Sequence, residues 1–236
     1  MDQTLSQTAL NLRWLGLVPY NEALALQNRA CDHVRQYRST YVLGLEHPAV
    51  VTLGKRGVAE RDLVANCSFS VMEVDRGGQA TLHSPGQLVV YPILALNEWS
   101  LGVRQYVEIL QKVTIASLAF LGIHSVSGDA VGCGPGIYTE RGKIAFIGVR
   151  VERGIAYHGI SINVFNDLDG FQQIRSCGIQ NARVDRIGDY RQDISLRDLF
   201  FTWSSLLQKQ LLLTSTQGLR HVVGKSSVSV VGSALP

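Results

Sequence analysis

Apolar positions recur with a helical period in two separate stretches of the chain. In 21–34 the apolar side chains return every three or four residues, and Asn21 precedes them, so we predict a first helix with Asn21 as its N-cap. An apolar stripe in 103–121 stops at Gly122. A glycine directly after such a stripe is a common helix C-cap, so this stretch predicts a second helix.

Runs rich in apolar, β-branched and aromatic residues predict strands between and after these helices. They cover 41–45, 50–53, 71–75, 88–94, 136–139, 143–151 and 155–164. Arg153 and Gly154 predict a turn that joins the last two strands into a hairpin. Helices and strands mix without a strict strand–helix–strand rhythm, which predicts an α+β fold with a mixed β-sheet and flanking helices.

The chain is long and apolar enough to bury the core of one domain. It has 236 residues, of which 46% are hydrophobic, and no repeat, charge block or linker divides it. Ser195 and Asp198 form a predicted capping box for a last helix. After Leu213 the composition turns to Ser, Thr, Gly and Val. We therefore expect one folded domain over 1–213 and a tail over 214–236 that is mobile or adds an edge strand.

Net charge, the N-terminus and the cysteines indicate which partners, location and cysteine chemistry to expect. The net charge is +3 and the basic residues are scattered, which disfavours nucleic acid and leaves an acidic protein partner open. The N-terminus lacks a basic stretch followed by an apolar one, and the longest apolar run is too short to cross a membrane, so we expect a cytoplasmic protein with no membrane partner. Four cysteines without a Cys-x-x-Cys pair predict free thiols rather than a zinc site or a disulfide framework.

The stretch 76–91 is a glycine-rich turn that runs into an apolar strand. Its glycines let the backbone approach a ligand where a Cβ atom would collide. Around the same turn, donors are offered by Arg76, Gln79, Thr81, His83 and Gln87. This combination predicts a pocket wall, and an ordinary hairpin turn with solvated polar residues is the alternative.

A cysteine and a lysine are the candidates for covalent chemistry. Arg175 favours the thiolate of Cys177, and Gly178 leaves the following amide open to an oxyanion. Lys143 opens an otherwise apolar strand, and a partly buried Cys/Lys pair can share one proton as nucleophile and base. The alternatives are a small buried thiol and a solvated lysine, and Cys133 is the rival nucleophile.

Two histidines occupy similar settings, each beside a small residue. His83 and His158 are predicted to line one pocket from two sides, either as catalytic or as structural residues. A metal is disfavoured because no third ligand stands at a suitable spacing. Strand alternation places Asn163, five residues after His158, on the opposite face unless a bulge intervenes.

At these motifs the chain resembles the octanoyltransferases of lipoate biosynthesis, also called lipoyl(octanoyl) transferases. The resemblance runs from about residue 15 to about residue 210. It is carried, in this order, by 46–54, 76–91, 135–138, 143–148, 158–159, Asn163 and 177–178.

The resemblance implies the α+β fold of lipoate and biotin protein ligases and an acyltransferase reaction. The octanoyl group would pass from octanoyl-acyl carrier protein, through a thioester on Cys177 of a Cys177/Lys143 dyad, to a lysine of a lipoyl domain. This is the first step of endogenous protein lipoylation, and the implied acceptors are the lipoyl domains of 2-oxoacid dehydrogenases and the glycine cleavage H protein. Because a thioester becomes a more stable amide, no ATP, metal or other cofactor is expected. The implied substrate-binding residues are Arg76, Gly77, Gly78, Gln79, Ala80, Thr81, Leu82, His83, Phe146, Ile147, Gly148, His158, Gly159, Ile160 and Ser161.

The sequence departs from the family pattern near these motifs. Leu82 stands where an aromatic residue is usual, Ser84 replaces a glycine, and Ser176 replaces a proline. Asp185 and Arg186 replace a typical Thr-Ser pair. These departures put the preferred acyl-chain length, the preferred acceptor and the rate in doubt.

Three other functions remain open at this point. An ATP-dependent lipoate or octanoate ligase of the same fold would use Lys143 without Cys177, although the chain has no P-loop pattern. A non-catalytic module would bind a carrier protein or a lipoyl domain, although both dyad residues are retained. A cysteine hydrolase would pair Cys177 with His158.

Overall fold

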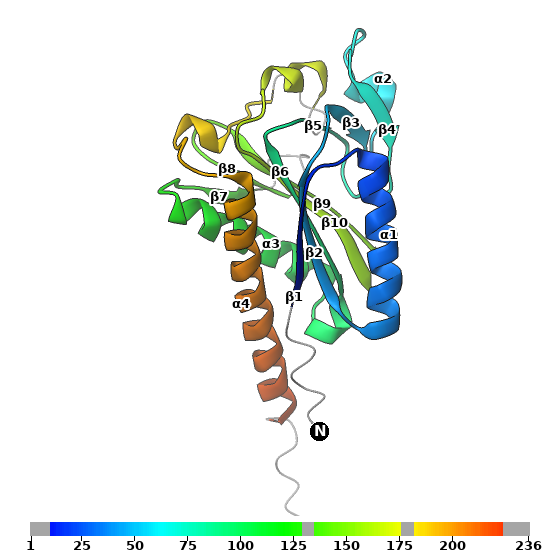
Figure 1. The fold of residues 1–236 in the computed structure, drawn as a ribbon, viewed down its shortest axis with the longest axis vertical. Helices are drawn as coiled ribbons and strands as arrows, with labels where there is room; N and C mark the ends of the chain where they lie inside the picture. The colour runs from blue at the N-terminus through cyan, green and yellow to red at the C-terminus, as the bar shows by residue number, and fades with distance from the viewer. Residues whose placement is uncertain (1–9, 129–134, 176–181, 224–236) are drawn as a thin grey trace, which may run out of the picture.

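The computed structural model describes residues 10–128, 135–175 and 182–223, with side-chain surroundings described to residue 214. A seven-stranded sheet has the order β1-β2-β6-β10-β9-β8-β7, and a three-stranded sheet has the order β4-β3-β5 (Figure 1). The strands are β1 Leu10–Leu17, β2 Thr40–Glu46, β3 Val50–Leu53, β4 Ser70–Glu73, β5 Ala80–His83, β6 Gln87–Ala95, β7 Val126–Gly128, β8 Gly136–Tyr138, β9 Lys143–Glu152 and β10 Ile155–Asn163. The helices are α1 Tyr20–Tyr37, α2 Ala59–Asp62, α3 Val103–Phe120 and α4 Leu196–Val223, with short 3-10 helices η1 Leu96–Trp99, η2 Asp169–Gln173 and η3 Ile187–Asp189.

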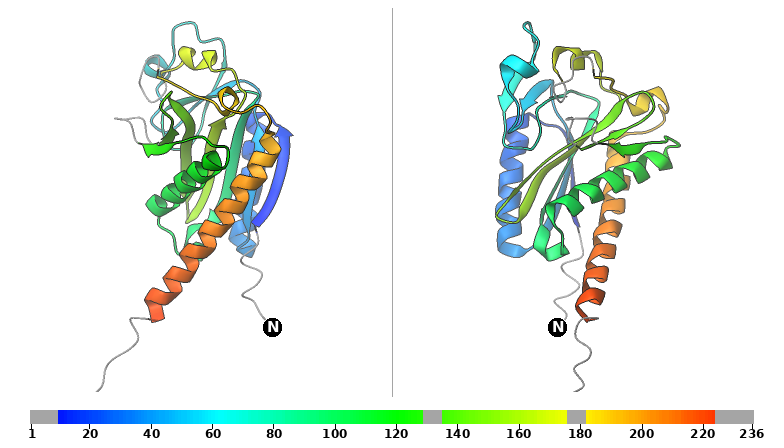
Figure 2. Two further views of the ribbon diagram at one scale, coloured as in Figure 1. Left: turned by 90° about the vertical axis from the view of Figure 1, so that its left-hand side faces the viewer. Right: turned by 180° about the vertical axis from the view of Figure 1, so that it is seen from behind.

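Helices cover both faces of the large sheet, as expected of the predicted mixed sheet with flanking helices. The views from the side and from behind show α3 and α4 on one face and α1 on the other (Figure 2). Each face buries its own apolar cluster, one with α3 and α4 and one with α1. The parallel pair β1 and β2 is joined through α1, whereas the other neighbouring strands of this sheet pair antiparallel.

The helices end largely where the sequence signals predicted. After α3, Gly122 adopts φ +75°, its N–H donates to the carbonyl of Ala119, and the N–H of Ile123 donates to the carbonyl of Leu118. This is a Schellman cap, as the glycine predicted. The predicted N-cap of α1 is wrong, because Pro19 takes that position and Asn21 lies within the first turn.

The last helix departs from the expected domain boundary. Ser195 caps α4 as predicted, because its hydroxyl accepts the N–H of Asp198 at 3.0 Å. The helix then continues through Leu213 to Val223, so 214–223 is helical and adds no edge strand. A helix propagates one hydrogen bond per residue until a breaker stops it, and no proline lies in 214–223. None of the helices that the structure describes, α4 included, is long and apolar enough to cross a membrane.

The predicted strands are confirmed, and three further strands were not predicted. Arg153 and Gly154 both have positive φ, as a tight turn between β9 and β10 requires. The sequence signals did not indicate β1 or the three-residue β7, and β5 lies inside the glycine-rich stretch. Only four residues long, β5 exists because it pairs with β3 along its whole length.

The packing of α4 on the large sheet predicts that alanine substitutions at two adjacent phenylalanines lower the free energy of unfolding by different amounts. Phe200 is fully buried against Gly44 of β2, where an added Cβ atom would lie 2.3 Å from the ring, whereas Phe201 is 39% exposed. We expect Phe200→Ala to lower the free energy of unfolding by about 3–5 kcal/mol, because it opens a cavity. Phe201→Ala should cost about 1 kcal/mol or less. Equal losses in urea unfolding of the two variants would contradict this packing.

Candidate active site

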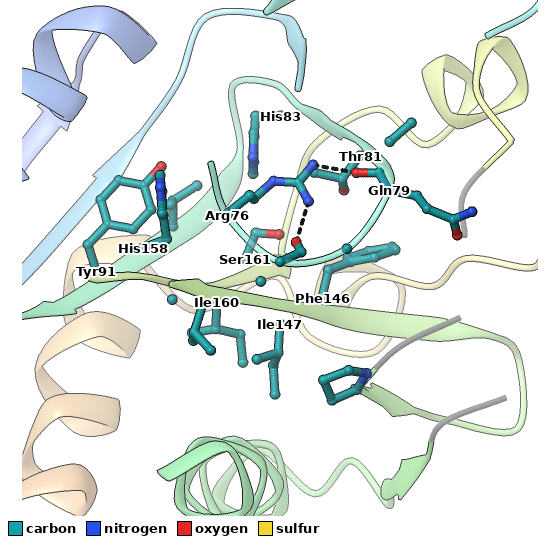
Figure 3. Close-up of a pocket in the computed structure, with 18 of the residues that line it drawn as sticks. Arg76, Gln79, Thr81, His83, Tyr91, Phe146, Ile147, His158, Ile160 and Ser161 are labelled. Carbon is teal, nitrogen blue, oxygen red and sulfur yellow. Dashed lines mark hydrogen bonds between the residues drawn. The ribbon is translucent and has the colours of Figure 1, made fainter. Parts of the chain in front are cut away.

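A cavity of about 270 Å³ opens between the glycine-rich turn and the β9–β10 hairpin (Figure 3). Helix α1, the loop after β3, and strands β5, β6, β9 and β10 complete its walls. The lining residues are Tyr20, Arg56, Arg76, Gly77, Gly78, Gln79, Ala80, Thr81, His83, Val89, Tyr91, Pro135, Lys143, Phe146, Ile147, Gly148, Val149, His158, Gly159, Ile160 and Ser161. The structure thus brings together Lys143 and the predicted substrate-binding residues, apart from Leu82.

Arg76 determines the shape of the glycine-rich turn. Its buried guanidinium donates to the hydroxyl and the carbonyl of Thr52 in β3, at 2.8 and 2.7 Å from Nη2. It also donates to the carbonyls of Gly77 and Gln79 at 2.9 and 2.8 Å. Carbonyls that face one cation inside a turn have no solvent to bind, so the guanidinium stabilises an otherwise costly conformation. The structure therefore gives Arg76 a role in building the wall, and its expected role as a donor to the ligand stays a prediction.

The turn lies directly on β9 because glycine is present on both sides of the contact. Gly77 donates its N–H to the carbonyl of Val149 at 3.0 Å. An added Cβ atom on Gly148 would lie 3.1 Å from both the Arg76 side chain and the Gly77 carbonyl. Gly78 adopts φ +90°, a conformation that glycine reaches at little cost.

Lys143 is buried at the start of β9 and lines the cavity. Only 5% of the residue is exposed, so the alternative of a solvated lysine is wrong. Its Nζ atom lies 5.0 Å from the ring centroid of Phe146 and 5.4 Å from that of Tyr138. An added Cβ atom on Gly136 would lie 2.2 Å from Cε of Lys143. Gly136 therefore leaves the space in which the lysine side chain lies across β8.

Cys177, the predicted nucleophile, lies outside the described residues, as does Cys133. The described residues on either side of 176–181 are each hydrogen-bonded to a distant part of the chain. Before it, Arg175 donates its N–H to the carbonyl of Asp62 at 2.7 Å. After it, Val184 forms a β-bridge with Lys143. Burial raises the pKa of the Cys31 thiol on α1 to about 11, so that cysteine stays protonated, as expected of a structural thiol.

A chain of side-chain amides determines the tautomer of His83. Asn163 donates to the carbonyl of Asp185, so its side-chain oxygen accepts from the Gln87 amide at 2.9 Å. The same Gln87 amide donates to the carbonyl of Leu82, so its oxygen must accept from Nδ1 of His83 at 2.7 Å. Burial holds the pKa of His83 well below its usual range, so the imidazole is neutral. Its Nε2 atom therefore carries no proton and acts as a hydrogen-bond acceptor.

His158 reaches the cavity through an unusual backbone conformation. It adopts φ +54°, and its ring stacks on Tyr157 with centroids 4.9 Å apart. Nε2 donates to the carboxylate of Asp75 at 2.8 Å, and this bond holds the pKa of Asp75 well below its usual range. Burial lowers the pKa of His158 despite that carboxylate. Asn163, in contrast, bonds to Gln87 and Asp185 and is not among the lining residues.

Three lining or supporting residues carried no signal in the sequence. Tyr20 and Tyr91 line the same end of the cavity as His83, and Tyr20 stacks on His83 with centroids 5.9 Å apart. Asp75 orients His158 from the end of the loop before the turn. The two tyrosines lie in apolar segments where an aromatic residue is ordinary core, so only their tertiary position distinguishes them.

Leu82 does not line the cavity, in contrast to the role that the resemblance implied. Of the four residues of β5, Ala80, Thr81 and His83 line the cavity and Leu82 does not. Leu82 is fully buried in an apolar cluster, and Gly170 of η2 makes room for it. Ser84, another departure, is half-buried and also lies off the lining. Among the described residues, no three His, Cys, Asp or Glu side chains gather closely enough to hold a metal ion.

Comparison with known proteins identifies the family. The family model "Lipoyl protein ligase A/B catalytic domain" matches residues 19–202. An octanoyltransferase of Alkalilimnicola ehrlichii is 40% identical over 182 residues, which is 77% of this chain and 83% of the relative. An octanoyltransferase of Marinobacter nauticus is 34% identical over 213 residues, 90% of this chain and 94% of the relative. The chain belongs to the octanoyltransferase family. Octanoyl transfer in lipoate biosynthesis, expected from the sequence, is confirmed at the level of that family.

Solved structures confirm the fold expected of an octanoyltransferase. A lipoate-protein ligase A bound with ATP superposes with a TM-score of 0.68 at 17% identity, covering 88% of this chain and 92% of the other. A biotin protein ligase from Aquifex aeolicus gives a TM-score of 0.51 at 12% identity, covering 91% and 74%. At such identities the likeness concerns the fold alone.

The buried His47 predicts a pH dependence of stability in this octanoyltransferase. Its Nδ1 donates to the carbonyl of Val18, its Nε2 accepts from the Tyr91 hydroxyl, and burial lowers its pKa to about 4. An unfolded histidine titrates near 6.5, so between about pH 6.5 and 4 the unfolded chain binds a proton that the folded chain does not. Stability should therefore fall as the pH falls through this window, by on the order of 3 kcal/mol from His47.

Urea unfolding across this pH window tests the effect. His47→Gln should make the free energy of unfolding less dependent on pH there, by about one proton. The exposed His33 supplies the matched control, and His33→Gln should leave the dependence as it is. An identical pH dependence in His47→Gln and the unchanged protein would show that His47 is not held neutral.

Proposed function

We propose that this protein transfers an octanoyl group from octanoyl-acyl carrier protein, through a thioester on Cys177, to a lysine of a lipoyl domain in the cytoplasm. The acceptors we expect are the lipoyl domains of 2-oxoacid dehydrogenases and the glycine cleavage H protein. The observation that carries the proposal is a buried Lys143 in the wall of a small, largely apolar cavity. Lysine is seldom buried to this degree, and here it lies at the cavity wall beside Phe146, which supports a role in the chemistry of the cavity.

The cavity suits a fatty chain better than a larger ligand. Its volume of about 270 Å³ lies just below the range of roughly 300–1,000 Å³ that holds drug-sized ligands. Phe146, Ile147 and Ile160 supply apolar contacts. Each methylene taken from water contributes about 0.8 kcal/mol, so the roughly seven carbons beyond the carbonyl of an octanoyl group would contribute about 5 kcal/mol.

The proposed reaction has two steps, acylation of Cys177 and transfer of the acyl group to the acceptor. Lys143 gives up a proton in the first step and takes one back in the second. The Cys177 thiolate attacks the carbonyl carbon of the donor thioester, the bond to the phosphopantetheine sulfur breaks, and that sulfur takes the proton of the Lys143 ammonium. The neutral amine of the acceptor lysine then attacks the acyl-enzyme. The bond to Cys177 breaks, and Lys143 takes the proton that the amine loses. The product is an amide, and the thiolate and ammonium are restored.

Because His83 is neutral, its Nε2 atom is excluded as a hydrogen-bond donor to the oxyanion. A histidine without a proton on Nε2 accepts a hydrogen bond and cannot stabilise a negative oxygen through that atom. We therefore assign the oxyanion to the main-chain N–H that follows Cys177. His83 would instead accept an N–H of the bound donor or acceptor.

The position of the sequence departures supports an ordinary octanoyl specificity. Leu82 and Ser84 lie off the cavity wall, so neither would change its length directly. The lining positions that match the family motifs remain available for the acyl chain.

Covalent loading of Cys177 is the direct test of this function. Incubation with octanoyl carrier protein should add one octanoyl group to the protein by intact mass, and Cys177→Ser should abolish the addition. Cys67→Ser, a change at a half-buried cysteine outside the cavity, should retain it. An adduct in the Cys177→Ser variant would refute the assignment. Pyrophosphate release from ATP and free octanoate would indicate a ligase instead.

The space beside Gly136 provides a second test, directed at Lys143. A Cβ atom there would displace the lysine side chain, so Gly136→Ala should slow both half-reactions by about 100-fold, nearly as much as Lys143→Ala. Gly102→Ala is the matched control, because a Cβ atom there has no neighbour closer than 3.5 Å. Single-turnover acylation and transfer rates measure the effect, and normal rates in Lys143→Ala would remove lysine from the mechanism.

A further inference from the structure

The segment that follows the Cys177 stretch is paired with the backbone of Lys143. The N–H of Lys143 donates to the carbonyl of Arg183 at 2.9 Å, and the carbonyl of Lys143 accepts the N–H of Asp185 at 3.0 Å. Gly142 lies so close to Arg183 that an added Cβ atom would approach its carbonyl carbon to 2.6 Å. The position of the Lys143 backbone therefore depends on where residues 183–185 are held.

A buried carboxylate holds that segment in place. The side chain of Asp185 is 1% exposed, and it accepts the hydroxyl protons of Thr139 and of Tyr190, the latter at 2.6 Å. It also accepts the N–H of Arg186 at 2.9 Å, and Nε of Arg141 lies 3.6 Å away. Thr139 and Arg141 belong to the turn between β8 and β9, immediately before Lys143. One carboxylate thus joins the two chain segments that meet at Lys143.

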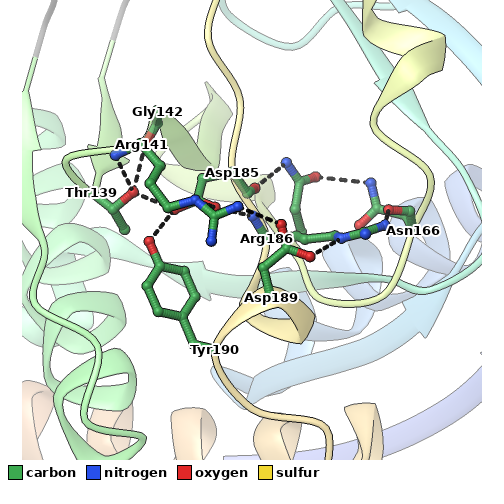
Figure 4. Close-up of polar contacts among 9 residues, drawn as sticks. Thr139, Arg141, Gly142, Asn166, Asp185, Arg186, Asp189 and Tyr190 are labelled. Carbon is green, nitrogen blue, oxygen red and sulfur yellow. Dashed lines mark hydrogen bonds and ion pairs between the residues drawn. The ribbon is translucent and has the colours of Figure 1, made fainter.

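Ion pairs outside the carboxylate complete the arrangement (Figure 4). Asp189 of η3 lies 2.8 Å from Arg141 and 2.8 Å from Arg186, so charges of opposite sign alternate. Arg186 also donates to the carbonyl of Asn166 at 3.2 Å. We call this set the Asp185 clamp; its members are Thr139, Arg141, Asp185, Arg186, Asp189 and Tyr190.

We propose that Asp185 is a positioning residue for Lys143, acting through the Asp185 clamp. The proposal rests on the proposed function, in which Lys143 holds the nucleophilic thiolate. Replacing this buried, multiply bonded carboxylate by an amide removes its charge and one of its two accepting oxygens, so some of its donors lose their acceptor and both segments loosen.

Two measurements on Asp185→Asn test the proposal. Hydrogen exchange at the amides of Lys143 and Asp185 reports whether the two segments remain paired, and it should accelerate about tenfold or more. The rate of Cys177 acylation should fall by about 10- to 100-fold, since a small displacement of a catalytic group has effects of this size. Its pH profile should move to higher pH, because a displaced ammonium no longer lowers the thiol pKa. Asp193→Asn, at an exposed Arg191 pair, is the matched control and should change neither measurement.

The outcomes distinguish a failure of the proposed Asp185 clamp from a failure of the proposed acyl-transfer function. Unchanged exchange in Asp185→Asn overturns the clamp, whatever the reaction is. Faster exchange with an unmoved pH profile overturns the positioning role. Failure of the unchanged protein to become acylated overturns the proposed function, and the exchange experiment still decides the clamp. If Asp185→Asn does not fold, Tyr190→Phe, which removes one hydrogen bond, must shift both measurements in the same direction; no shift overturns the proposal.

Discussion

The cavity depends on the hydrogen bonds that the buried guanidinium of Arg76 donates within its own turn. The guanidinium lies inside a turn whose carbonyls point inward, where it binds the carbonyls of Gly77 and Gln79 and both oxygens of Thr52. Without a buried cation those carbonyls would be unsatisfied, and the turn would adopt another shape. Because the turn then rests on β9 through Gly77 and Gly148, one side chain sets the distance between the two walls.

Each group near the proposed chemistry is held by a partner distant in the chain. Lys143 lies across Gly136 and over two aromatic rings, and its backbone is paired with residues 183–185. The tautomer of His83 is set by a chain of hydrogen bonds that runs from the carbonyl of Asp185 through the side chains of Asn163 and Gln87. Such hydrogen-bond networks fix both the positions of the side chains and the atoms that carry protons. The proposed reaction requires this, because it moves a proton to and from one side chain.

Local signals predicted much of the fold and little of the site's geometry. The Gly122 cap, the Ser195 cap and the Arg153 and Gly154 turn are each specified by a few adjacent residues, so they could be predicted. The start of α1 and the strand β5 could not, because Pro19 and the pairing with β3 override the local pattern. Polar composition after Leu213 does not end α4, because Ser, Thr and Gln are tolerated within a helix and the segment holds no proline.

The sequence by itself determined the α+β class, the order of the motifs, the glycine-rich turn and the choice of Lys143 and Cys177 as candidates. The tertiary structure alone decided that Lys143 is buried, that Arg76 binds its own turn, that His83 is an acceptor, and that Leu82 does not line the cavity. The physical reason is that burial, protonation and direction depend on which atoms surround a side chain. Those atoms come from strands and turns far apart in the chain, and only their pairing brings them together.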